Sequence, residues 1–408
     1  MICGLLGEKL GHSYSPQIHK NLGNYSYSLY EKTPEELDAF LTSGDFHGLN
    51  VTIPYKKSVL KYCNRLSPEA EKLGAANTIV RQDDGTLIGH NTDYYGFRYM
   101  ATRIQMDYTG KKVLVLGSGG ASNTVCAVME ELGANPVVIS RNGENNYKNL
   151  HRHSDCAVII NATPVGMYPN TGISPIELDH FSHLEYVMDL IYNPGKTKLL
   201  LDAEIRGIPT ANGLWMLVAQ AAESSHWFTG EPFDPESIPR IYKQLKMQMQ
   251  NIVLIGMPGC GKSTIGKTLA QKLGKDFADS DAEIESAAGC AIAEIFRTRG
   301  EAYFRQLETA ALANLAKRSA CVIATGGGCV TQKENFSILR QNATILWIKR
   351  DLSALPTEGR PLSQTTALEQ MYQLREPLYR TFAHGAIENN ATVEEASEKI
   401  IRLLEEMI

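Results

Sequence analysis

The segment 251–263 constrains the fold of this chain more than any other. An apolar run, NIVLI at 251–255, leads directly into GMPGCGKS at 256–263, which matches the pattern G-x-x-x-x-G-K-[ST]. Ile265, Leu269 and Leu273 then recur at four-residue spacing, as on one face of a helix. A strand, a glycine loop and an amphipathic helix in this order begin α/β nucleotide-binding units. We therefore predict an α/β domain from residue 251 that binds a nucleoside triphosphate.

The residues of this loop have separate predicted roles. Backbone N–H groups of the loop and the start of the helix attract phosphate. Lys262 would neutralise the β- and γ-phosphate oxygens, and the Ser263 hydroxyl can hold Mg²⁺. The alternative is a glycine turn that only caps a helix. The residues predicted to contact the triphosphate are Gly259, Cys260, Gly261, Lys262, Ser263 and Thr264.

Charged side chains further along could bind a metal ion and a second substrate. Asp279 and Asp281 could serve Mg²⁺ and an acceptor hydroxyl separately, although either could be a helix N-cap. Arg305 and Arg375 offer planar guanidinium groups that suit a carboxylate, although each alone would more often be a surface charge. Three glycines at 326–328, after the strand-like CVIAT, suit the close approach of a small ligand.

In this order, the motifs resemble shikimate kinase. The matching segments cover about 251–385 and are GMPGCGKST, DSD, FRQLE, GGG, GRPL and REPLYR. The resemblance implies that Asp281 holds shikimate hydroxyls and activates the one that attacks, while Asp279 supports Mg²⁺ through water. It implies that Arg305 and Arg375 bind the carboxylate and that Gly327 lies against the ring.

The resemblance also extends to a mobile lid. It implies that Arg360, in GRPL, comes from this lid to stabilise the transferring phosphoryl group and contact the nucleotide. The family usually has another arginine several residues earlier, where it stacks on adenine. The stretch 353–359 of this chain has none.

A second glycine loop, GSGGAS at 117–122, follows the strand-like KKVLVL. Another strand-like run, PVVIS, ends about 20 residues later, where NAD-binding units place an acidic residue that binds the ribose hydroxyls. This chain has Ser140 and Arg141 there, and an arginine would pair with a 2′-phosphate. The residues favour NADP over NAD, unless Arg141 is only an exposed loop charge. The loop residues predicted to contact NADP(H) are Gly117, Ser118, Gly119, Gly120 and Ala121.

The first hundred residues carry three further signals. HSYSP at 12–16 places two hydroxyls before an expected helix, NVTIPYKK at 50–57 is strand-like until its proline, and GHNTD at 89–93 precedes a helical run. By residue chemistry alone, the two serines and Asp93 could be ordinary helix caps.

Together with the glycine loop, these segments resemble shikimate dehydrogenase over about 1–240. Further matching segments are GAANT, NATPVGM, DLIYNP and NGLWMLVAQA. The resemblance implies that Lys56 and Asp93 are the catalytic pair. The Lys56 ammonium would stabilise charge on the ketone oxygen and supply its proton, and Asp93 would orient Lys56 and bind a substrate hydroxyl.

The same resemblance implies the rest of the pocket. Ser13 and Ser15 would hold the substrate carboxylate. The pocket would be completed by Thr52, Asn77, Tyr192 and Gln220, and the nicotinamide end of the cofactor would contact Leu190 and Gly213. Trp215 stands where the family often has a small residue, so we expect it to reshape the mouth of the pocket. Discrimination between shikimate and quinate is left open.

The expected fold is α/β throughout. Residues 1–102 form a shikimate-dehydrogenase-like substrate-binding domain, and 103–212 form an NADP-binding Rossmann domain. Helices in 213–245 return to the substrate domain, 246–250 form a linker, and 251–408 form a P-loop kinase domain with a parallel sheet. A length of 408 residues fits several hydrophobic cores.

Composition narrows the setting. The net charge is -5 and there is no basic run, so no nucleic-acid partner is expected. We find no signal peptide and no apolar stretch long enough to span a bilayer, so no membrane partner is expected either. The eight cysteines form no C-x-x-C pair, which argues against a zinc site or a disulfide framework. A reduced, cytoplasmic protein of undetermined oligomeric state is expected.

The two resemblances imply consecutive reactions. 3-Dehydroshikimate would be reduced with NADPH to shikimate, which ATP and Mg²⁺ would convert to shikimate 3-phosphate, toward aromatic amino acids. One alternative is a ligand-sensing regulator that has lost both activities, but the pairs Lys56–Asp93 and Lys262–Asp281 are all present. Another is a quinate-specific dehydrogenase joined to a kinase of different specificity.

Overall fold

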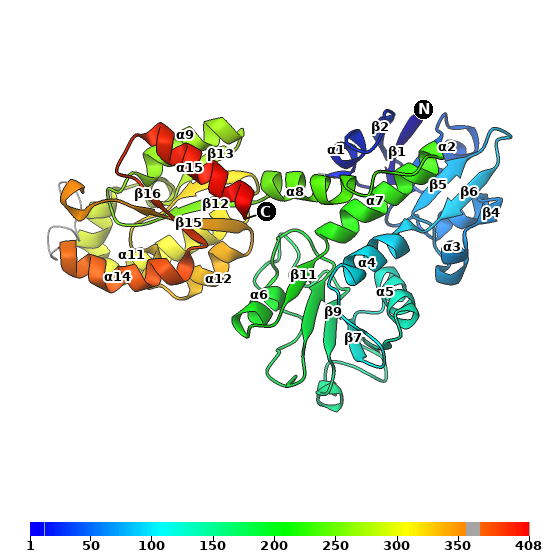
Figure 1. Ribbon diagram of the computed structural model, residues 1–408, viewed down its shortest axis with the longest axis horizontal. Helices are drawn as coiled ribbons and strands as arrows, with labels where there is room; N and C mark the ends of the chain where they lie inside the picture. The colour runs from blue at the N-terminus through cyan, green and yellow to red at the C-terminus, as the bar shows by residue number, and fades with distance from the viewer. Residues whose placement is uncertain (12, 356–367, 408) are drawn as a thin grey trace. The chain divides into compact units, whose positions relative to one another are not determined.

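The computed structural model describes residues 1–11, 13–355 and 368–407 (Figure 1). The chain divides into two compact units. Unit 1 comprises Met1–Pro164, Pro175–Tyr192 and Asp202–Gln244, and unit 2 comprises Val165–Ser174, Asn193–Leu201 and Leu245–Ile408. Across the described part of the chain, no helix has the length and apolar character needed to cross a membrane.

Unit 1 begins with a six-stranded mixed sheet in the order β2-β1-β3-β5-β6-β4. Strand β1 pairs in parallel with β2 and β3, whereas β5 is antiparallel to β3 and β6. The strands are β1 (Ile2–Gly7), β2 (Ser26–Glu31), β3 (Gly48–Val51), β4 (Arg65–Leu66), β5 (Thr78–Arg81) and β6 (Leu87–His90). The apolar residues Leu6, Leu49, Val51 and Ile79 lie in its core, as expected for strands that alternate toward a buried face.

Helices from both ends of unit 1 pack around this sheet. α7 lies along α4 and against β3 and β5, so the chain after Gly213 returns to the first sheet (Figure 1). Gly48 permits this approach, because a Cβ there would lie 2.2 Å from the Phe228 ring. The helices are α1 (Ser15–Lys20), α2 (Leu37–Ser43), η1 (Ser58–Tyr62), α3 (Pro68–Leu73), α4 (Thr92–Thr102) and α7 (Leu214–Thr229). α8 (Ser237–Met249) follows, and the division between the two units falls within it.

The second sheet of unit 1 is five-stranded and entirely parallel, in the order β11-β10-β9-β7-β8. Its strands are β7 (Lys112–Leu116), β8 (Asn135–Ile139), β9 (Val158–Asn161), β10 (Tyr186–Asp189) and β11 (Thr210–Asn212). The connections contain α5 (Gly120–Glu131), η2 (Leu150–His153) and α6 (Lys198–Ile205). The glycine loop at 117–122 therefore joins a central strand to α5, which confirms the predicted Rossmann arrangement.

The sheet of unit 2 is also five-stranded and parallel, in the order β13-β14-β12-β15-β16. Its strands are β12 (Asn251–Ile255), β13 (Asp276–Asp279), β14 (Cys321–Ala324), β15 (Ala343–Lys349) and β16 (Gly385–Glu388). All of β12 is buried, as expected for a central parallel strand covered on both faces. The predicted α/β kinase fold is confirmed.

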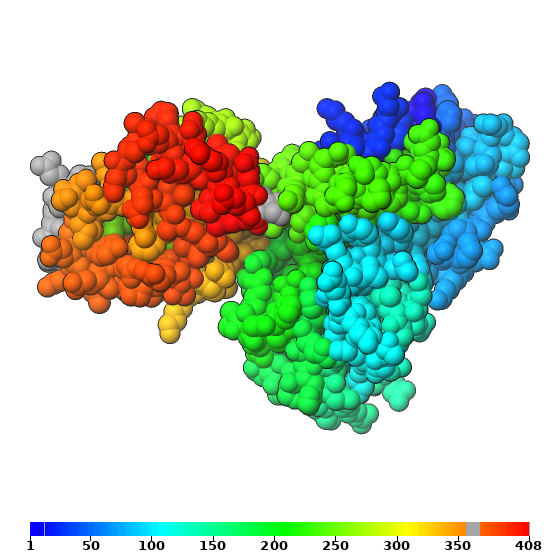
Figure 2. Space-filling model, in the orientation of Figure 1, coloured from blue at the N-terminus to red at the C-terminus, as the bar shows by residue number. Residues whose placement is uncertain are grey.

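Helices cover the sheet of unit 2. They are α9 (Lys262–Leu273), α10 (Ser280–Ala288), α11 (Ile292–Ala316), η3 (Cys329–Thr331), α12 (Glu334–Arg340), η4 (Leu352–Ala354), α14 (Leu368–Phe382) and α15 (Val393–Glu406). In the space-filling view, α15 (red) covers part of the visible face of this unit (Figure 2). Its Ile400 and Leu404 are buried beneath that face.

The prediction of a linker at 246–250 is wrong, because most of this segment is helical. α8 continues to Met249, and β12 begins at Asn251. The physical reason is the spacing of Ile238, Ile241, Leu245 and Met249, which all bury their side chains and recur every three or four residues along one face of the helix. An apolar face of this kind keeps the segment helical.

Candidate active sites

Unit 1 contains a pocket of about 570 Å³. It gathers the expected substrate residues Ser13, Ser15, Thr52, Lys56, Asn77, Asp93, Tyr192 and Gln220, which come from segments up to two hundred residues apart in the sequence. Burial raises the pKa of the Tyr192 phenol, so this residue offers a neutral O–H group. Neither serine is the N-cap of α1, because Tyr14 holds that position.

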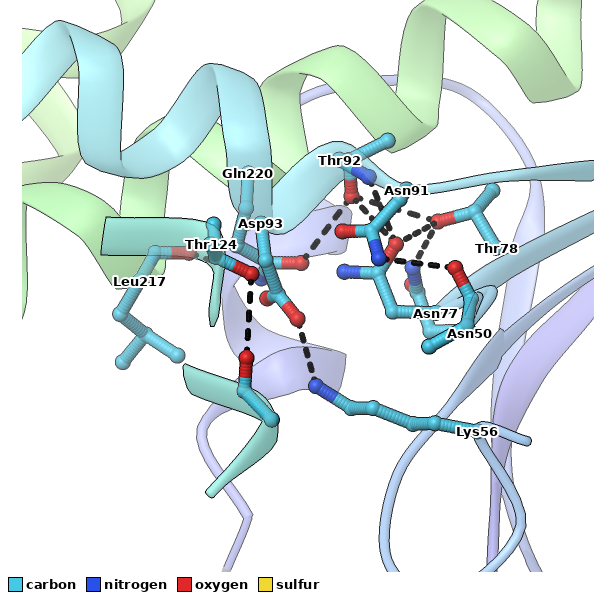
Figure 3. Close-up of polar contacts among 12 residues, drawn as sticks. Asn50, Lys56, Asn77, Thr78, Asn91, Thr92, Asp93, Thr124, Leu217 and Gln220 are labelled. Carbon is cyan, nitrogen blue, oxygen red and sulfur yellow. Dashed lines mark hydrogen bonds and ion pairs between the residues drawn. The ribbon is translucent and has the colours of Figure 1, made fainter. Parts of the chain in front are cut away.

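The Lys56 ammonium lies 2.6 Å from a carboxylate oxygen of Asp93, and both side chains are partly buried (Figure 3). Lys56 follows β3 and the turn at Pro54, whereas Asp93 lies in the first turn of α4. A helix N-terminus favours a negative charge. The pair therefore presents an ionised carboxylate and an ammonium at the wall of the same pocket.

Buried polar side chains near this pair join four elements of unit 1; Figure 3 shows Asn50, Thr78 and Thr92 among them. Ser224 Oγ on α7 lies 2.9 Å from both Thr78 Oγ1 and Thr92 Oγ1, and it accepts from Asn50 Nδ2 at 2.8 Å. Asn77 Oδ1 accepts from the backbone N–H of Thr92 at 2.7 Å. These bonds fix the start of α4 next to the Asp93 carboxylate. The sequence analysis did not identify Ser224, Thr78 or Thr92, although the two threonines stand in the GAANT and NTD segments.

We expect Ser224→Ala to lower the free energy of unfolding by about 1–3 kcal/mol, because buried partners lose a hydrogen bond. Ser224 is fully buried and also donates to Gln220 O at 2.8 Å. Ser43→Ala is the matched control, since the exposed Ser43 only bonds within α2 and should change stability by less than about 0.5 kcal/mol. The free energy of unfolding of both variants is measured by urea titration, with the remaining reduction activity as the signal for folded protein. Equal midpoints for the two variants would contradict the network.

The glycine loop of unit 1 fits a dinucleotide. Gly117 has φ +105, and a Cβ there would lie 2.9 Å from Thr163. Nothing lies within 4 Å of a Cβ built on Gly119 or Gly120, so the N-terminus of α5 is open for a phosphate. At Gly213, which is predicted to contact the nicotinamide end, a Cβ would lie 1.9 Å from the Leu190 carbonyl oxygen, so only glycine fits.

The structure divides the predicted cofactor residues into two groups. Gly120, Ala121, Leu190 and Gly213 line the pocket. The remaining residues, which lie outside its lining, are Gly117, Ser118, Gly119, Ser140 and Arg141. Arg141 follows β8 and is exposed, as a group that meets the far end of a dinucleotide would be.

The expected effect of Trp215 on the pocket mouth is wrong. The indole stacks on Tyr242 of α8 at 3.6 Å between ring centroids, and the Arg103 guanidinium lies 3.9 Å from its ring. Met216 and Leu217 line the pocket instead. The reason is helical phase: each step along α7 rotates the side chain by about 100°, which turns Trp215 away.

Unit 2 contains a pocket of about 730 Å³ around the phosphate-loop motif. Gly259, Gly261, Lys262, Ser263 and Thr264 line it. Gly259 (φ +81) and Gly261 (φ +101) adopt left-handed conformations that favour glycine. Lys262 Nζ donates to the carbonyl oxygens of Gly256 and Met257, both at 2.9 Å. Cys260 is buried and lies outside the lining, where its carbonyl oxygen accepts from Asn389 Nδ2 at 2.7 Å.

The two aspartates have different environments. Asp279 accepts from Ser263 Oγ at 2.6 Å through one oxygen, and through the other it caps α10 by accepting from the N–H of Asp281. Asp279 is thus both the N-cap of α10 and a hydrogen-bond partner of the Ser263 hydroxyl. These two oxygen donors fit Mg²⁺, which is commonly held by few protein ligands together with phosphates. Burial, and then the nearby Asp279 charge, raise the pKa of the Asp281 carboxyl.

The predicted carboxylate-binding residues surround the three glycines. Arg305 pairs with the fully buried Glu308 at 2.7 Å, and Arg375 Nη1 donates to Gly327 O at 3.2 Å. A Cβ on Gly327 would lie 2.6 Å from Pro258, which explains the need for glycine. The sequence analysis quoted Glu308 only as part of FRQLE; its position three residues after Arg305 on a helix was the available signal.

Asp281 and Glu308 converge on Gly326. A Cβ there would lie 2.8 Å from Asp281 Oδ1 and 2.7 Å from Glu308 Oε1. Within the described residues, neither oxygen has a hydrogen-bond partner. The site therefore offers two acceptors for the hydroxyls of a ligand. Arg360, the predicted lid arginine, lies outside the described residues, as does His12 of HSYSP.

Comparison with known proteins agrees with both sites. Residues 5–79 match the family model of the shikimate dehydrogenase substrate binding domain, and residues 258–405 match that of shikimate kinase. The chain is 34% identical over 276 residues to shikimate dehydrogenase (NADP(+)) of Caldanaerobacter subterraneus subsp. tengcongensis, covering 61% of this chain and 97% of that protein. It is 36% identical over 265 residues to the Clostridium perfringens enzyme of the same name, covering 60% and 97%.

Solved structures resemble unit 1 and its sequence. Shikimate dehydrogenase 1 from Peptoclostridium difficile superposes with a TM-score of 0.55 at 38% identity, covering 60% of this chain and 98% of that chain. Shikimate 5-dehydrogenase from Thermus thermophilus, in complex with NADP(H) and shikimate, gives 0.55 at 29% identity and covers 60% and 99%. This chain therefore belongs to the shikimate dehydrogenase family and carries a shikimate kinase domain after it.

Proposed function

We propose that this chain catalyses two successive steps of aromatic amino acid (chorismate) biosynthesis. It reduces 3-dehydroshikimate to shikimate with NADPH, and it phosphorylates shikimate to shikimate 3-phosphate with ATP and Mg²⁺. The observation that carries the proposal is that each unit holds its own acid–base group in a pocket with groups for a polyhydroxy carboxylate. Lys56 and Asp93 lie in one pocket, and Lys262 and Asp281 line the other.

The reduction uses an ammonium held in place by a carboxylate. NADPH supplies the hydride when bound. Lys56 donates a proton to the ketone oxygen as charge develops there, and Asp93 orients Lys56 through the 2.6 Å ion pair. Ser13 and Ser15 hold the substrate carboxylate, and Thr52, Asn77, Tyr192 and Gln220 bind its remaining polar groups.

The phosphorylation uses a buried carboxylate as the base. Asp281 accepts the proton of the attacking hydroxyl, and its raised pKa suits it to this role. Lys262, which now donates to the loop carbonyls, would neutralise the phosphate oxygens of a bound nucleotide; Ser263, and Asp279 through water, would hold Mg²⁺. Arg305 and Arg375 bind the substrate carboxylate, Gly327 lies against the ring, and Arg360, which lies outside the described residues, stabilises the transferring group.

The proposal is tested on the purified chain. 3-Dehydroshikimate and NADPH are mixed with it and the loss of NADPH absorbance is followed. ATP and Mg²⁺ are then added, and shikimate 3-phosphate is measured by mass spectrometry. Absence of the phosphorylated product would refute the kinase step, and NADPH consumption no faster than without protein would refute the reduction. In a parallel assay of the reverse reaction, the oxidation of shikimate by NADP⁺ is compared with that of quinate. A faster rate with quinate would favour the alternative of a quinate-specific dehydrogenase.

Arg141 is proposed to bind the 2′-phosphate of NADPH. We expect Arg141→Ser to raise the KM for NADPH by about 10- to 100-fold, the effect of losing a charge-assisted hydrogen bond, and to leave the rate with NADH unchanged. Arg152→Ser, which removes another exposed arginine of the same unit, is the control and should change neither. Steady-state kinetics with both cofactors measures the effect. Equal rates with NADH and NADPH in the unsubstituted enzyme would contradict the assignment of Arg141 to the 2′-phosphate.

The cellular setting is also a proposal. All eight cysteines are free thiols, and Cys3, Cys156, Cys260, Cys321 and Cys329 are buried. Proteins of oxidising compartments commonly pair their cysteines, whereas the cytosol keeps thiols reduced. We propose the cytoplasm as the location.

A further inference from the structure

Arg350 is a cation of the unit 2 pocket to which none of the predicted roles applies. It follows the last residue of β15, is exposed, and lines the same pocket as Lys262, Asp281 and Arg375. Within the described part of the chain it has no hydrogen bond or ion pair. Its neighbour Lys349, by contrast, pairs with Glu388 at 3.5 Å and lies 4.6 Å from the Trp347 ring. The Arg350 guanidinium is therefore available for a ligand.

The backbone places Arg350 beside the phosphate loop. β15 pairs with β12, and a Cβ on Gly256, the first loop residue, would lie 2.3 Å from the Ile348 carbonyl oxygen. Asn389 connects the same regions, since its backbone N–H donates to Lys349 O and its side chain donates to Cys260 O, both at 2.7 Å. The backbone at Arg350 is thus held close to the phosphate loop.

Arg350 approaches from the opposite side to the shikimate-binding groups. In the sheet order β13-β14-β12-β15-β16, Asp281 and Gly327 follow β13 and β14, whereas Arg350 follows β15. The phosphate loop follows β12, between the two sides. A guanidinium at this position is therefore placed to contact the phosphate donor and not the acceptor.

The charge of the pocket leads to the same assignment. Four carboxylates (Asp279, Asp281, Glu285 and Glu308) and four cations (Lys262, Arg305, Arg350 and Arg375) line it, so removal of one cation leaves an excess of negative charge. Arg305 is engaged by Glu308 and Glu301, and Arg375 by Gly327. A polyphosphate requires compensating positive charge, and a free guanidinium can bind phosphate through two parallel hydrogen bonds.

We propose that Arg350 binds the phosphates of the nucleotide and thereby sets the affinity of the kinase site for MgATP. The inference deepens the proposed kinase function and rests on it. It assigns Arg350 to the phosphate donor and not to the shikimate carboxylate, so the two Michaelis constants should respond differently to its removal.

The test compares Arg350→Ala and Arg350→Lys with the unsubstituted chain. Arg350→Ala should raise the KM for MgATP by about 10- to 100-fold, as expected for a lost charge-assisted hydrogen bond, with the KM for shikimate changed less than about twofold. Arg350→Lys should lie between, because an ammonium keeps the charge without the paired donors. Lys349→Ala is the matched control, since it removes the adjacent cation outside the pocket lining, and it should leave both constants unchanged.

Two further measurements separate the possible failures. Far-ultraviolet circular dichroism and thermal unfolding of each variant show whether unit 2, which carries the substitution, is folded. Calorimetric titration with MgATP measures nucleotide affinity directly, so Arg350 is tested even if the unsubstituted chain forms no shikimate 3-phosphate and the kinase proposal fails. Unchanged MgATP affinity in Arg350→Ala, or a rise confined to the KM for shikimate, would overturn the assignment.

Discussion

Lys56→Ala is expected to reduce 3-dehydroshikimate about 10²- to 10⁴-fold more slowly than the unsubstituted enzyme, because the ketone oxygen loses its positioned proton donor. Phosphorylation of shikimate by the same protein should be unchanged, since Lys56 lines only the pocket of unit 1. The measurement is kcat for NADPH oxidation alongside kcat for shikimate 3-phosphate formation on one preparation.

Lys61→Ala is the control for this experiment. Lys61 lies in η1, is exposed and contacts the Tyr62 ring outside the pocket lining, so its loss should leave both rates unchanged. Asp93→Asn should also slow the reduction, because the neutral amide no longer pairs with the ammonium at 2.6 Å. If Lys56→Ala lowered both activities in parallel in a fully folded protein, the assignment of separate sites would fail.

Asp281→Asn should give the reciprocal result. We expect phosphorylation to fall by about 10²- to 10⁴-fold, because an amide cannot accept the proton of the attacking hydroxyl. The asparagine side chain has nearly the same size as aspartate, so the substitution should leave the packing beside Gly326 unchanged. Shikimate 3-phosphate formation at saturating MgATP measures the loss, and the reduction rate should stay constant.

Asp276→Asn is the matched control for the second prediction. Asp276 begins β13, the strand that precedes Asp281 in the chain, but is exposed and lies outside the pocket lining. The Asp276→Asn substitution removes one carboxylate from unit 2 but leaves the groups that bind the acceptor intact, so the rate of phosphorylation should be unchanged. Full activity of Asp281→Asn would exclude this carboxylate as the base and would leave the neighbouring Glu308 as the acceptor to test.

The sequence was sufficient for the parts of each site that depend on local chain geometry. KKVLVL and NIVLI form the central strands β7 and β12, because continuous apolar runs before glycine suit buried parallel strands. The adjacent loops then follow from the backbone freedom of glycine. Lys56 follows β3 and the turn at Pro54, and Asp93 lies in the first turn of α4; both stand in segments that the sequence analysis recognised.

What could not be predicted depends on contacts between distant segments. Ser224 bonds to Thr78 across 146 positions of sequence; Thr78 stands in the GAANT segment, but no local pattern marks the Ser224 hydroxyl. Arg350 becomes a pocket residue only because β15 lies next to β12. The direction of the Trp215 side chain depends on the rotational phase of α7. The prediction of a linker at 246–250 gave too little weight to the apolar face of α8.

The presence of one pocket of each kind in every chain has a consequence for metabolism. Two separately expressed enzymes can vary in relative abundance with transcription and turnover. In this protein the copy number of the two catalysts is always equal, whatever the expression level. The steady-state concentration of free shikimate in the cell is then governed by the ratio of the two rate constants and by the supply of NADPH and ATP, and changes in gene dosage scale both steps together.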